Sequence, residues 1–297
     1  MVEIADHLYI PAEKYKEFKN NHHNYQDGGN PRMNSASKKA ILVVSFGTSY
    51  ENTRKLTIEA IEHDIADAFP ACPTYRAWTS KMIIAKLKKR DGLTIHTVKE
   101  ALEQMLLDGI TDVIVQPTHV INGIENDQMK ADALSFRDRF SSIVFGNPLL
   151  TTEEDNQAIV RVVADEFRDM DPDTALVLMG HGTEHYANTV YAALDYRFKD
   201  TGHKNIFLGT VEAYPALDSL LRAADSFHPK KIVLAPFMIV AGDHAQNDLA
   251  GADPDSWMNR LSSEGYEVTP VLKGLGEYPQ VRQILVEHVQ QAMNASI

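Results

Sequence analysis

Short apolar runs alternate along this chain with segments in which apolar residues recur at helical spacing. A short apolar run between Ala40 and Phe46, formed by residues 41–44, stops at Gly47, and an apolar periodicity of helical type then follows as far as Phe69. This pattern predicts a buried strand followed by a helix. The pattern returns in the second half of the chain, which indicates that the unit is used more than once.

Comparing the chain with itself reveals an internal repeat. The segment AILVVSFGT, which begins at Ala40, resembles ALVLMGHGT, which begins at Ala175. Further along, VIVQPTHVING from Val113 parallels IVLAPFMIVAG from Ile232. A repeat on this scale predicts two lobes with the same architecture.

The remaining elements follow from the same comparison. We expect second strands at 74–78 and 205–210, fourth strands at 142–145 and 267–271, and closing helices at 156–168 and 280–293. Nearly continuous apolar strands that alternate with helices are typical of parallel sheets covered on both faces. The expected fold class is therefore α/β, with two similar doubly wound parallel-sheet lobes and a cleft between them.

The predicted domain organisation has three parts. Residues 1–37 are polar and end in a turn-rich stretch, so they are expected to form an N-terminal appendage. Residues 38–170 form the first α/β lobe and residues 171–297 the second, with the last helix packing on the first lobe.

The amino-acid composition excludes several classes of partner and site. The 297 residues carry 29 Lys plus Arg against 41 Asp plus Glu, a net charge of -12 that argues against a nucleic-acid partner. The single cysteine, Cys72, excludes an internal disulfide and a four-cysteine metal site. No secretory signal is expected, and the longest uncharged apolar run, Ile232 to Gly242, is too short to span a bilayer. We expect a cytoplasmic protein with no membrane partner, and homo-oligomerisation is left open.

Candidate chemistry lies where the two repeats differ. Phe46 in the first repeat corresponds to His181 in the second, and Glu125 corresponds to His244. Ligands of doubly wound sheets bind beyond the carboxyl ends of the strands, where these residues fall. If the lobes face each other, Glu125, His181 and His244 can converge.

Each candidate also has a purely structural explanation. His181 lies between two glycines, which favours its presentation to a cleft, although a histidine at a strand end can simply hydrogen-bond its neighbours. A carboxylate such as Glu125 is ordinarily a solvated surface group. Glu125 becomes a candidate site residue because it corresponds to His244 in the repeat. The secondary candidates, for which packing or helix capping is the alternative, are Glu212, His119, His185 and Asp243.

Two imidazoles and one carboxylate suit a borderline divalent ion such as cobalt, iron, nickel or zinc, whereas calcium and magnesium require more oxygen ligands. The chain has neither an HExxH helix nor a glycine-rich phosphate loop, which disfavours a conventional zinc protease and nucleotide binding. No organic cofactor is expected.

Several motifs together resemble one family. They are LVVSFGTSY from Leu42, HVINGIE from His119, MGHG from Met179, VEAYP from Val211 and VAGDHA from Val240. From about residue 38 to residue 293 the chain resembles the anaerobic cobalt chelatases of the CbiK family, which are related to the class II chelatases.

The resemblance implies a tetrapyrrole site between two lobes, with metal contacts at His181, His244 and Glu125 and catalytic roles for His181 and Glu125. It implies insertion of a divalent metal, above all Co²⁺ as substrate with Fe²⁺ or Ni²⁺ as alternatives, into sirohydrochlorin or a related tetrapyrrole. The pathway would be anaerobic cobalamin or sirohaem-type biosynthesis.

Metal insertion requires two pyrrole N–H protons to leave while the ion exchanges protein ligands for ring nitrogens. Our hypothesis is that His181 and His244 hold the ion and that Glu125 completes the ligand set or takes a proton. The alternatives are a two-lobed protein that binds or delivers a metal or tetrapyrrole without transforming it, and a metal-dependent hydrolase. The sequence does not assign substrate-binding residues.

Overall fold

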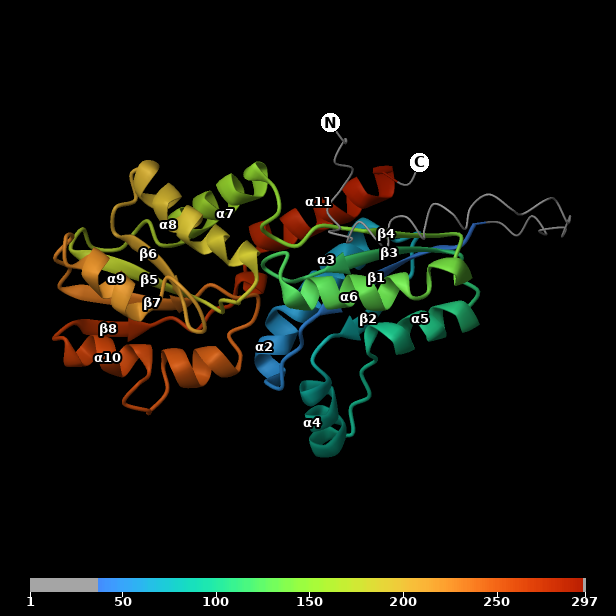
Figure 1. The fold of residues 1–297 in the computed structure, drawn as a ribbon, viewed down its shortest axis with the longest axis horizontal. Helices are drawn as coiled ribbons and strands as arrows, with labels where there is room; N and C mark the ends of the chain where they lie inside the picture. The colour runs from blue at the N-terminus through green and yellow to red at the C-terminus, as the bar shows by residue number, and fades with distance from the viewer. Residues whose placement is uncertain (1–36, 296–297) are drawn as a thin grey trace, which may run out of the picture. The chain divides into compact units, whose positions relative to one another are not determined.

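The structure is a computed structural model, and it describes residues 37–295 (Figure 1). The predicted appendage, residues 1–37, lies outside the described residues except for Ser37. The described residues belong to one compact unit, within which we call residues 37–170 the first half and residues 171–295 the second half.

The first half contains a four-stranded parallel sheet with strand order β2-β1-β3-β4. Its strands are β1 (Lys39–Ser45), β2 (Thr74–Trp78), β3 (Asp112–Pro117) and β4 (Ser142–Phe145). Its helices are α2 (Glu51–Leu56), α3 (Ile58–Ala68), α4 (Lys81–Asp91), α5 (Val98–Leu107), α6 (Ile124–Leu134), the short η1 (Arg137–Arg139) and α7 (Glu153–Glu166).

The second half repeats this sheet in the order β6-β5-β7-β8. Its strands are β5 (Thr174–Gly180), β6 (Ile206–Thr210), β7 (Lys231–Pro236) and β8 (Glu267–Pro270). Its helices are η2 (Tyr186–Asn188), α8 (Thr189–Asp200), α9 (Leu217–Ala224), the π-helix η3 (Ala245–Leu249), α10 (Trp257–Ser263), η4 (Leu275–Glu277) and α11 (Pro279–Ala295).

The central strands explain the continuous apolar runs. In β1, Ile41 lies opposite Thr74 of β2 and Ile114 of β3, and in β5 every residue is buried. A strand with paired neighbours on both sides and helices on both faces is buried on both faces, which favours apolar side chains at nearly every position. The expected α/β fold with two similar doubly wound parallel sheets is confirmed.

Both sheets change winding direction at the same place. The chain runs from β1 outward to β2 and then returns to β3 on the other side of β1, and β5, β6 and β7 do the same. The two reversal points therefore lie between β1 and β3 and between β5 and β7. In open α/β sheets, ligands bind at this switch point, beyond the carboxyl ends of the strands.

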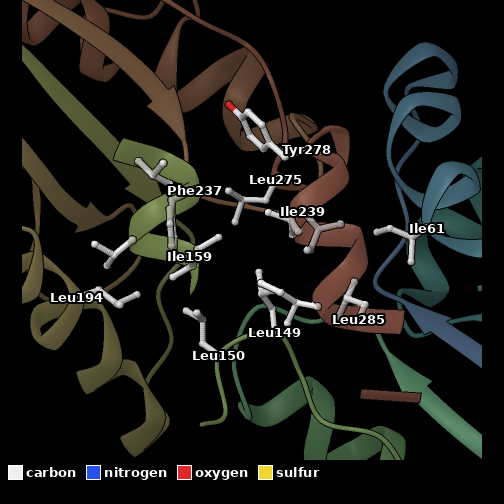
Figure 2. Close-up of a cluster of buried hydrophobic side chains, with 14 of the residues drawn as sticks. Ile61, Leu149, Leu150, Ile159, Leu194, Phe237, Ile239, Leu275, Tyr278 and Leu285 are labelled. Atoms are coloured by element: carbon white, nitrogen blue, oxygen red, sulfur yellow. The ribbon is translucent and has the colours of Figure 1, made fainter. Parts of the chain in front are cut away.

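The two halves share their closing helices. Helix α11 follows the second sheet but packs on α3 and on β3 and β4 of the first half, and α7 packs on α8 and α11. The largest hydrophobic cluster combines residues of both halves, and Figure 2 shows Ile159 of α7 and Leu285 of α11 among its members. The predicted lobe boundary near residue 170 stays a prediction, because no single cut separates these helices from both cores.

Most predicted elements have their expected bounds, with one difference in the first helix. The helical periodicity from Leu56 to Phe69 corresponds to two helices, α2 and α3, which are separated at Thr57. A Cβ atom on Gly276 would lie 2.9 Å from Cβ of Thr57, so η4 packs closely against the break. Among residues 37–295, no helix has the length and apolar character needed to cross a bilayer.

Candidate metal centre

His181 follows the last residue of β5, at the switch point of the second sheet. It is held in a sharp turn between Gly180 and Gly182. Gly182 has a φ of +86°, and a Cβ there would lie 2.8 Å from Cβ of Thr210 and 2.9 Å from the amide nitrogen of Ala213. The site therefore requires glycine at position 182, as the sequence pattern suggested.

His244 lies on the other side of the switch point, in the loop after β7. It begins the π-helix η3, a conformation that is rare and is often found at functional sites. Its Nδ1 lies 2.7 Å from Oδ2 of Asp248, one turn along the chain. The ring planes of His181 and His244 meet at 85°, with ring centroids 4.7 Å apart.

Glu212 supplies a carboxylate to this pair from the end of β6, the third neighbouring strand. Its Oε2 lies 3.6 Å from Nδ1 of His181, and its Oε1 lies 3.8 Å from Nε2 of His244. One ligand atom from each of the three residues lies within 4.8 Å of the other two. The three side chains have the composition and spacing of a metal-binding group, which we call the candidate metal centre.

The hydrogen bonds of the two histidines define their tautomers. Nδ1 of His181 lies 2.7 Å from the carbonyl oxygen of Gly182, which can only accept, and Nδ1 of His244 faces the carboxylate of Asp248. Both rings therefore donate through Nδ1–H in their neutral form, which leaves the lone pair of Nε2 free to bind a cation. Such partners commonly orient metal-binding histidines.

Glu125, the predicted third ligand, is not part of this group. It is the second residue of α6 in the first half and is half-buried. Its charge raises the pKa values of Tyr191 and His119, although burial is the larger influence on both groups. Tyr191 lies against the Gly180 turn, where a Cβ on Gly180 would be 2.6 Å from its ring.

His119 follows β3 at the first-half switch point, and it is half-buried with both ring nitrogens out of contact with solvent. Neither of its ring nitrogens has a hydrogen-bond partner among residues 37–295. Burial lowers the pKa of His119 to about 4, against the opposing influence of Glu125, so the ring is neutral at pH 7. His119 does not belong to the candidate metal centre.

Two further secondary candidates connect the halves. Nδ1 of His185 accepts a hydrogen bond from the Ala187 amide, so its Nε2 carries the proton and faces Oδ2 of Asp127 at 3.4 Å. Asp243 accepts a hydrogen bond from the hydroxyl of Tyr50. Burial, followed by the charge of Asp243, raises the pKa of Tyr50. Neither His185 nor Asp243 belongs to the candidate metal centre.

Two patterns in the sequence point to different carboxylates. Comparing the repeats favoured Glu125, because it corresponds to His244. Strand order favours Glu212 instead, since β6, β5 and β7 are neighbours and each is followed by one member of the group. Adjacent parallel strands place their following residues at one edge of the sheet.

These features describe a two-lobed α/β protein with a candidate metal centre at a sheet switch point. Residues 39–294 match the family model described as cobalt chelatase (CbiK). The chain is 39% identical over 260 residues to the sirohydrochlorin cobaltochelatase of Salmonella typhimurium, which covers 88% of this chain and 98% of that protein. It is 32% identical over 266 residues to the sirohydrochlorin cobaltochelatase CbiKC of Nitratidesulfovibrio vulgaris, covering 87% and 92%. The chain belongs to the cobalt chelatase (CbiK) family.

Solved structures support the fold independently. SirB from Bacillus subtilis aligns with a TM-score of 0.60 at 14% identity, covering 87% of this chain and 97% of that one. CbiX, described as the terminal enzyme of sirohaem biosynthesis in denitrifying bacteria, aligns with a TM-score of 0.51 at 16% identity, covering 85% and 99%. At these identities, the likeness concerns the fold alone.

Proposed function

We propose that this protein inserts Co²⁺ into sirohydrochlorin. The observation that carries the proposal is the grouping of His181, Glu212 and His244 at a sheet switch point, in a chain of the cobalt chelatase family. The named relatives are sirohydrochlorin cobaltochelatases, which supports the same metal and the same tetrapyrrole here.

In this proposal the three side chains of the candidate metal centre hold the incoming ion. Imidazole nitrogen and carboxylate oxygen suit cobalt, and also iron and nickel, so the ligand types do not select cobalt by themselves. All three side chains are partly solvent-exposed, at 38% for His181, 52% for Glu212 and 32% for His244. An ion that is a substrate must leave again, and an open three-ligand group permits this better than a closed four-ligand one.

We assign Glu125 to the proton transfer that insertion requires. Two pyrrole N–H protons have to leave the ring as the metal enters it, and the two histidines cannot accept them while their Nε2 lone pairs bind the ion. Glu125 is a half-buried carboxylate outside the candidate metal centre, and it is the group whose charge influences both Tyr191 and His119. Glu125 would therefore act on the macrocycle, and Glu212 on the metal.

The two carboxylates can be separated by experiment. We expect Glu212→Gln and His181→Ala to weaken Co²⁺ binding to the tetrapyrrole-free protein at least about tenfold, as measured by calorimetry, and to abolish insertion. Glu125→Gln should bind Co²⁺ like the wild type but insert it more slowly, by about a hundredfold, which is typical for loss of a general base. Insertion is followed from the change in the sirohydrochlorin absorption spectrum.

The results that contradict the proposal are specific. Full insertion activity in His181→Ala would exclude the candidate metal centre. Loss of Co²⁺ binding in Glu125→Gln, with normal binding in Glu212→Gln, would restore the original assignment of Glu125 as the third ligand. A wild-type protein that changes the spectrum no faster than the uncatalysed mixture would be a binding or delivery protein instead.

A further inference from the structure

Helix α4 is strongly basic in an acidic protein. It carries five cationic side chains, Lys81, Lys86, Lys88, Lys89 and Arg90, against one carboxylate, Asp91, whereas the whole chain has a net charge of -12. Many lysines elsewhere, such as Lys55, Lys199 and Lys273, pair with carboxylates. In the part of the chain that the structure describes, Lys86 and Lys89 have no hydrogen-bond or ion-pair partner.

The basic residues of α4 lie on two different sides. Leu87 is fully buried and packs in a cluster with Ile58 and Trp78, which fixes the inner face of the helix. Lys81 and Lys88 line a groove of about 480 Å³ between α4 and α5, and the charge of Lys88 contributes to lowering the pKa of Glu100 on α5.

The other side has a different character. Met82, Lys86 and Lys89 are spaced by four and three residues, so they form one stripe along the helix. All three are exposed, and Met82 is 77% exposed, which is unusual for a side chain of its apolar surface. We call these three residues the α4 stripe.

Helix α4, which carries the stripe, is bonded to the loop that follows β1 in the first half, residues 46–50. Both ends of α4 bond to this loop: the Ser80 amide donates to the Phe46 carbonyl at 3.2 Å, and Nη2 of Arg90 donates to the Ser49 carbonyl at 2.7 Å. Arg90 is one turn beyond Lys86, so it reaches the loop from the same side of the helix as the stripe. In Figure 1, α4 projects from the first half close to α2.

The same loop reaches the segment that carries His244. A Cβ on Gly242, two residues before His244, would lie 3.4 Å from Oγ1 of Thr48, and the Tyr50 hydroxyl donates to Asp243. Phe46, at the start of the loop, is 44% exposed and is the first-half counterpart of His181. An exposed aromatic ring, an exposed methionine and two unpaired lysines therefore accompany the loop that adjoins the His244 segment.

We propose that the α4 stripe binds the substrate's edge, with Lys86 and Lys89 pairing with its peripheral carboxylates and Met82 contacting the apolar ring. This inference rests on the proposed function, because it takes sirohydrochlorin as the ligand. Sirohydrochlorin is a polycarboxylate, which a chain with a charge of -12 would repel overall. A local positive patch beside the site reverses this repulsion where the ligand arrives and raises its association rate.

The test compares two pairs of lysines on one helix. Lys86→Gln/Lys89→Gln removes two charges from the α4 stripe, and Lys81→Gln/Lys88→Gln removes two charges from the side that faces α5. Binding of metal-free sirohydrochlorin is measured by fluorescence, with no cobalt present, at low and high salt. Steady-state insertion then gives KM for sirohydrochlorin and kcat separately.

We expect the stripe variant to bind sirohydrochlorin about three- to thirtyfold more weakly, as for the loss of two exposed charge pairs, with KM rising and kcat nearly unchanged. The difference from the wild type should shrink at high salt. The control variant should change binding less than twofold, and both variants should bind Co²⁺ like the wild type.

Two outcomes would overturn the inference: wild-type binding by the stripe variant, or an equal loss in both variants, which would indicate a general effect of helix charge. Failure of the proposed function can be distinguished from failure of this inference. If the wild-type protein inserts no cobalt but binds sirohydrochlorin through Lys86 and Lys89, the proposed function is wrong and the role of the α4 stripe in binding stands. If the wild type is active but the stripe variant binds sirohydrochlorin normally, the proposed function stands and the role of the α4 stripe in binding is wrong.

Discussion

A buried histidine joins the two halves at a distance from the candidate metal centre, and its removal should destabilise the fold. Nδ1 of His288 on α11 lies 3.0 Å from the carbonyl oxygen of Asn147, and its Nε2 lies 2.9 Å from Oδ1 of Asp155 in the first turn of α7. Both partners are hydrogen-bond acceptors, so the ring links α11 to two acceptors of the first half.

The state of Asp155 follows from its surroundings. Burial raises the pKa of this carboxyl group. The hydrogen bonds from His288 and from the Thr152 amide together lower it by more than burial raises it, so the pKa lies below its usual value. Asp155 is therefore ionised at neutral pH, and the contact is a buried hydrogen bond between the His288 ring and a carboxylate. The side chains are only 1% and 9% exposed.

We predict that His288→Leu lowers the free energy of unfolding by about 2–3 kcal/mol. Removing one partner of a buried pair typically costs about 3–5 kcal/mol, because the other charge stays buried. The amides of Thr151 and Thr152 remain bonded to the Asp155 carboxylate at 3.3 and 2.8 Å, which places the expected loss below that range. For a protein of this size, the melting temperature should fall by about 5 °C.

Urea unfolding followed by tryptophan fluorescence measures this loss, since the buried Trp78 reports on the first half and the buried Trp257 on the second. The matched control is His63→Ala, which removes a 72% exposed ring that lies 3.3 Å from Asp67 on the surface of α3. Its effect should stay within about 0.5 kcal/mol. Equal urea midpoints for His288→Leu and His63→Ala would refute the reasoning.

The pH dependence gives a second check on the same pair. Because the pKa of Asp155 is lowered by folding, its contribution is present above the ordinary carboxyl value of 3.8 and is lost as the pH falls through the lower value of the folded state. The difference in stability between wild type and His288→Leu should therefore shrink below about pH 4. A difference that is constant through this range would show that the carboxylate charge is not involved.

Two further predictions concern the candidate metal centre. Asp248→Asn should weaken Co²⁺ binding about tenfold in calorimetry and leave the urea midpoint unchanged, because Asp248 only orients the His244 ring. An unchanged Co²⁺ affinity would exclude that role. Gly182→Ala should lower both stability, by about 2 kcal/mol or more, and Co²⁺ affinity, because its Cβ would collide with Thr210 and Ala213. Its control, Gly202→Ala, has a similar φ of +97° but no atom within 4 Å of the new Cβ, so an equal loss in both variants would indicate backbone strain alone.

The strands could be predicted from the sequence nearly to the residue, for a physical reason. Central parallel strands such as β1 and β5 are buried on both faces and read as unbroken apolar runs that stop at glycine. The edge strands β4 and β8 are short and carry weaker patterns, and the internal repeat made them predictable. The break between α2 and α3 had no such signal, since it adjoins η4, which is more than 200 residues further along the chain.

The metal-binding and catalytic roles that the sequence suggests stay predictions. The sequence indicated His181 and His244, because each departs from the repeat at a strand end, and the structure brings their rings together. The sequence places Glu125 ahead of Glu212, because comparing two repeats identifies corresponding positions, whereas the structure groups Glu212 with the two histidines. The sequence alone could not predict the α4 stripe either, because a lysine can be recognised as unpaired only when the positions of the surrounding carboxylates are known.

The placement of these groups implies a division of labour between the halves, which the repeat made possible. His181, Glu212 and His244 follow three adjacent strands of one sheet, so the second half sets most of their spacing, while Tyr50 of the first half contacts Asp243 beside His244. Glu125 and the α4 stripe belong to the first half. Affinity for the ion should then depend less on contacts between the halves than binding of the macrocycle and loss of its protons do. A chelatase gains from this arrangement, because the ion can be held before the macrocycle arrives and released as the ring nitrogens replace the protein's ligands.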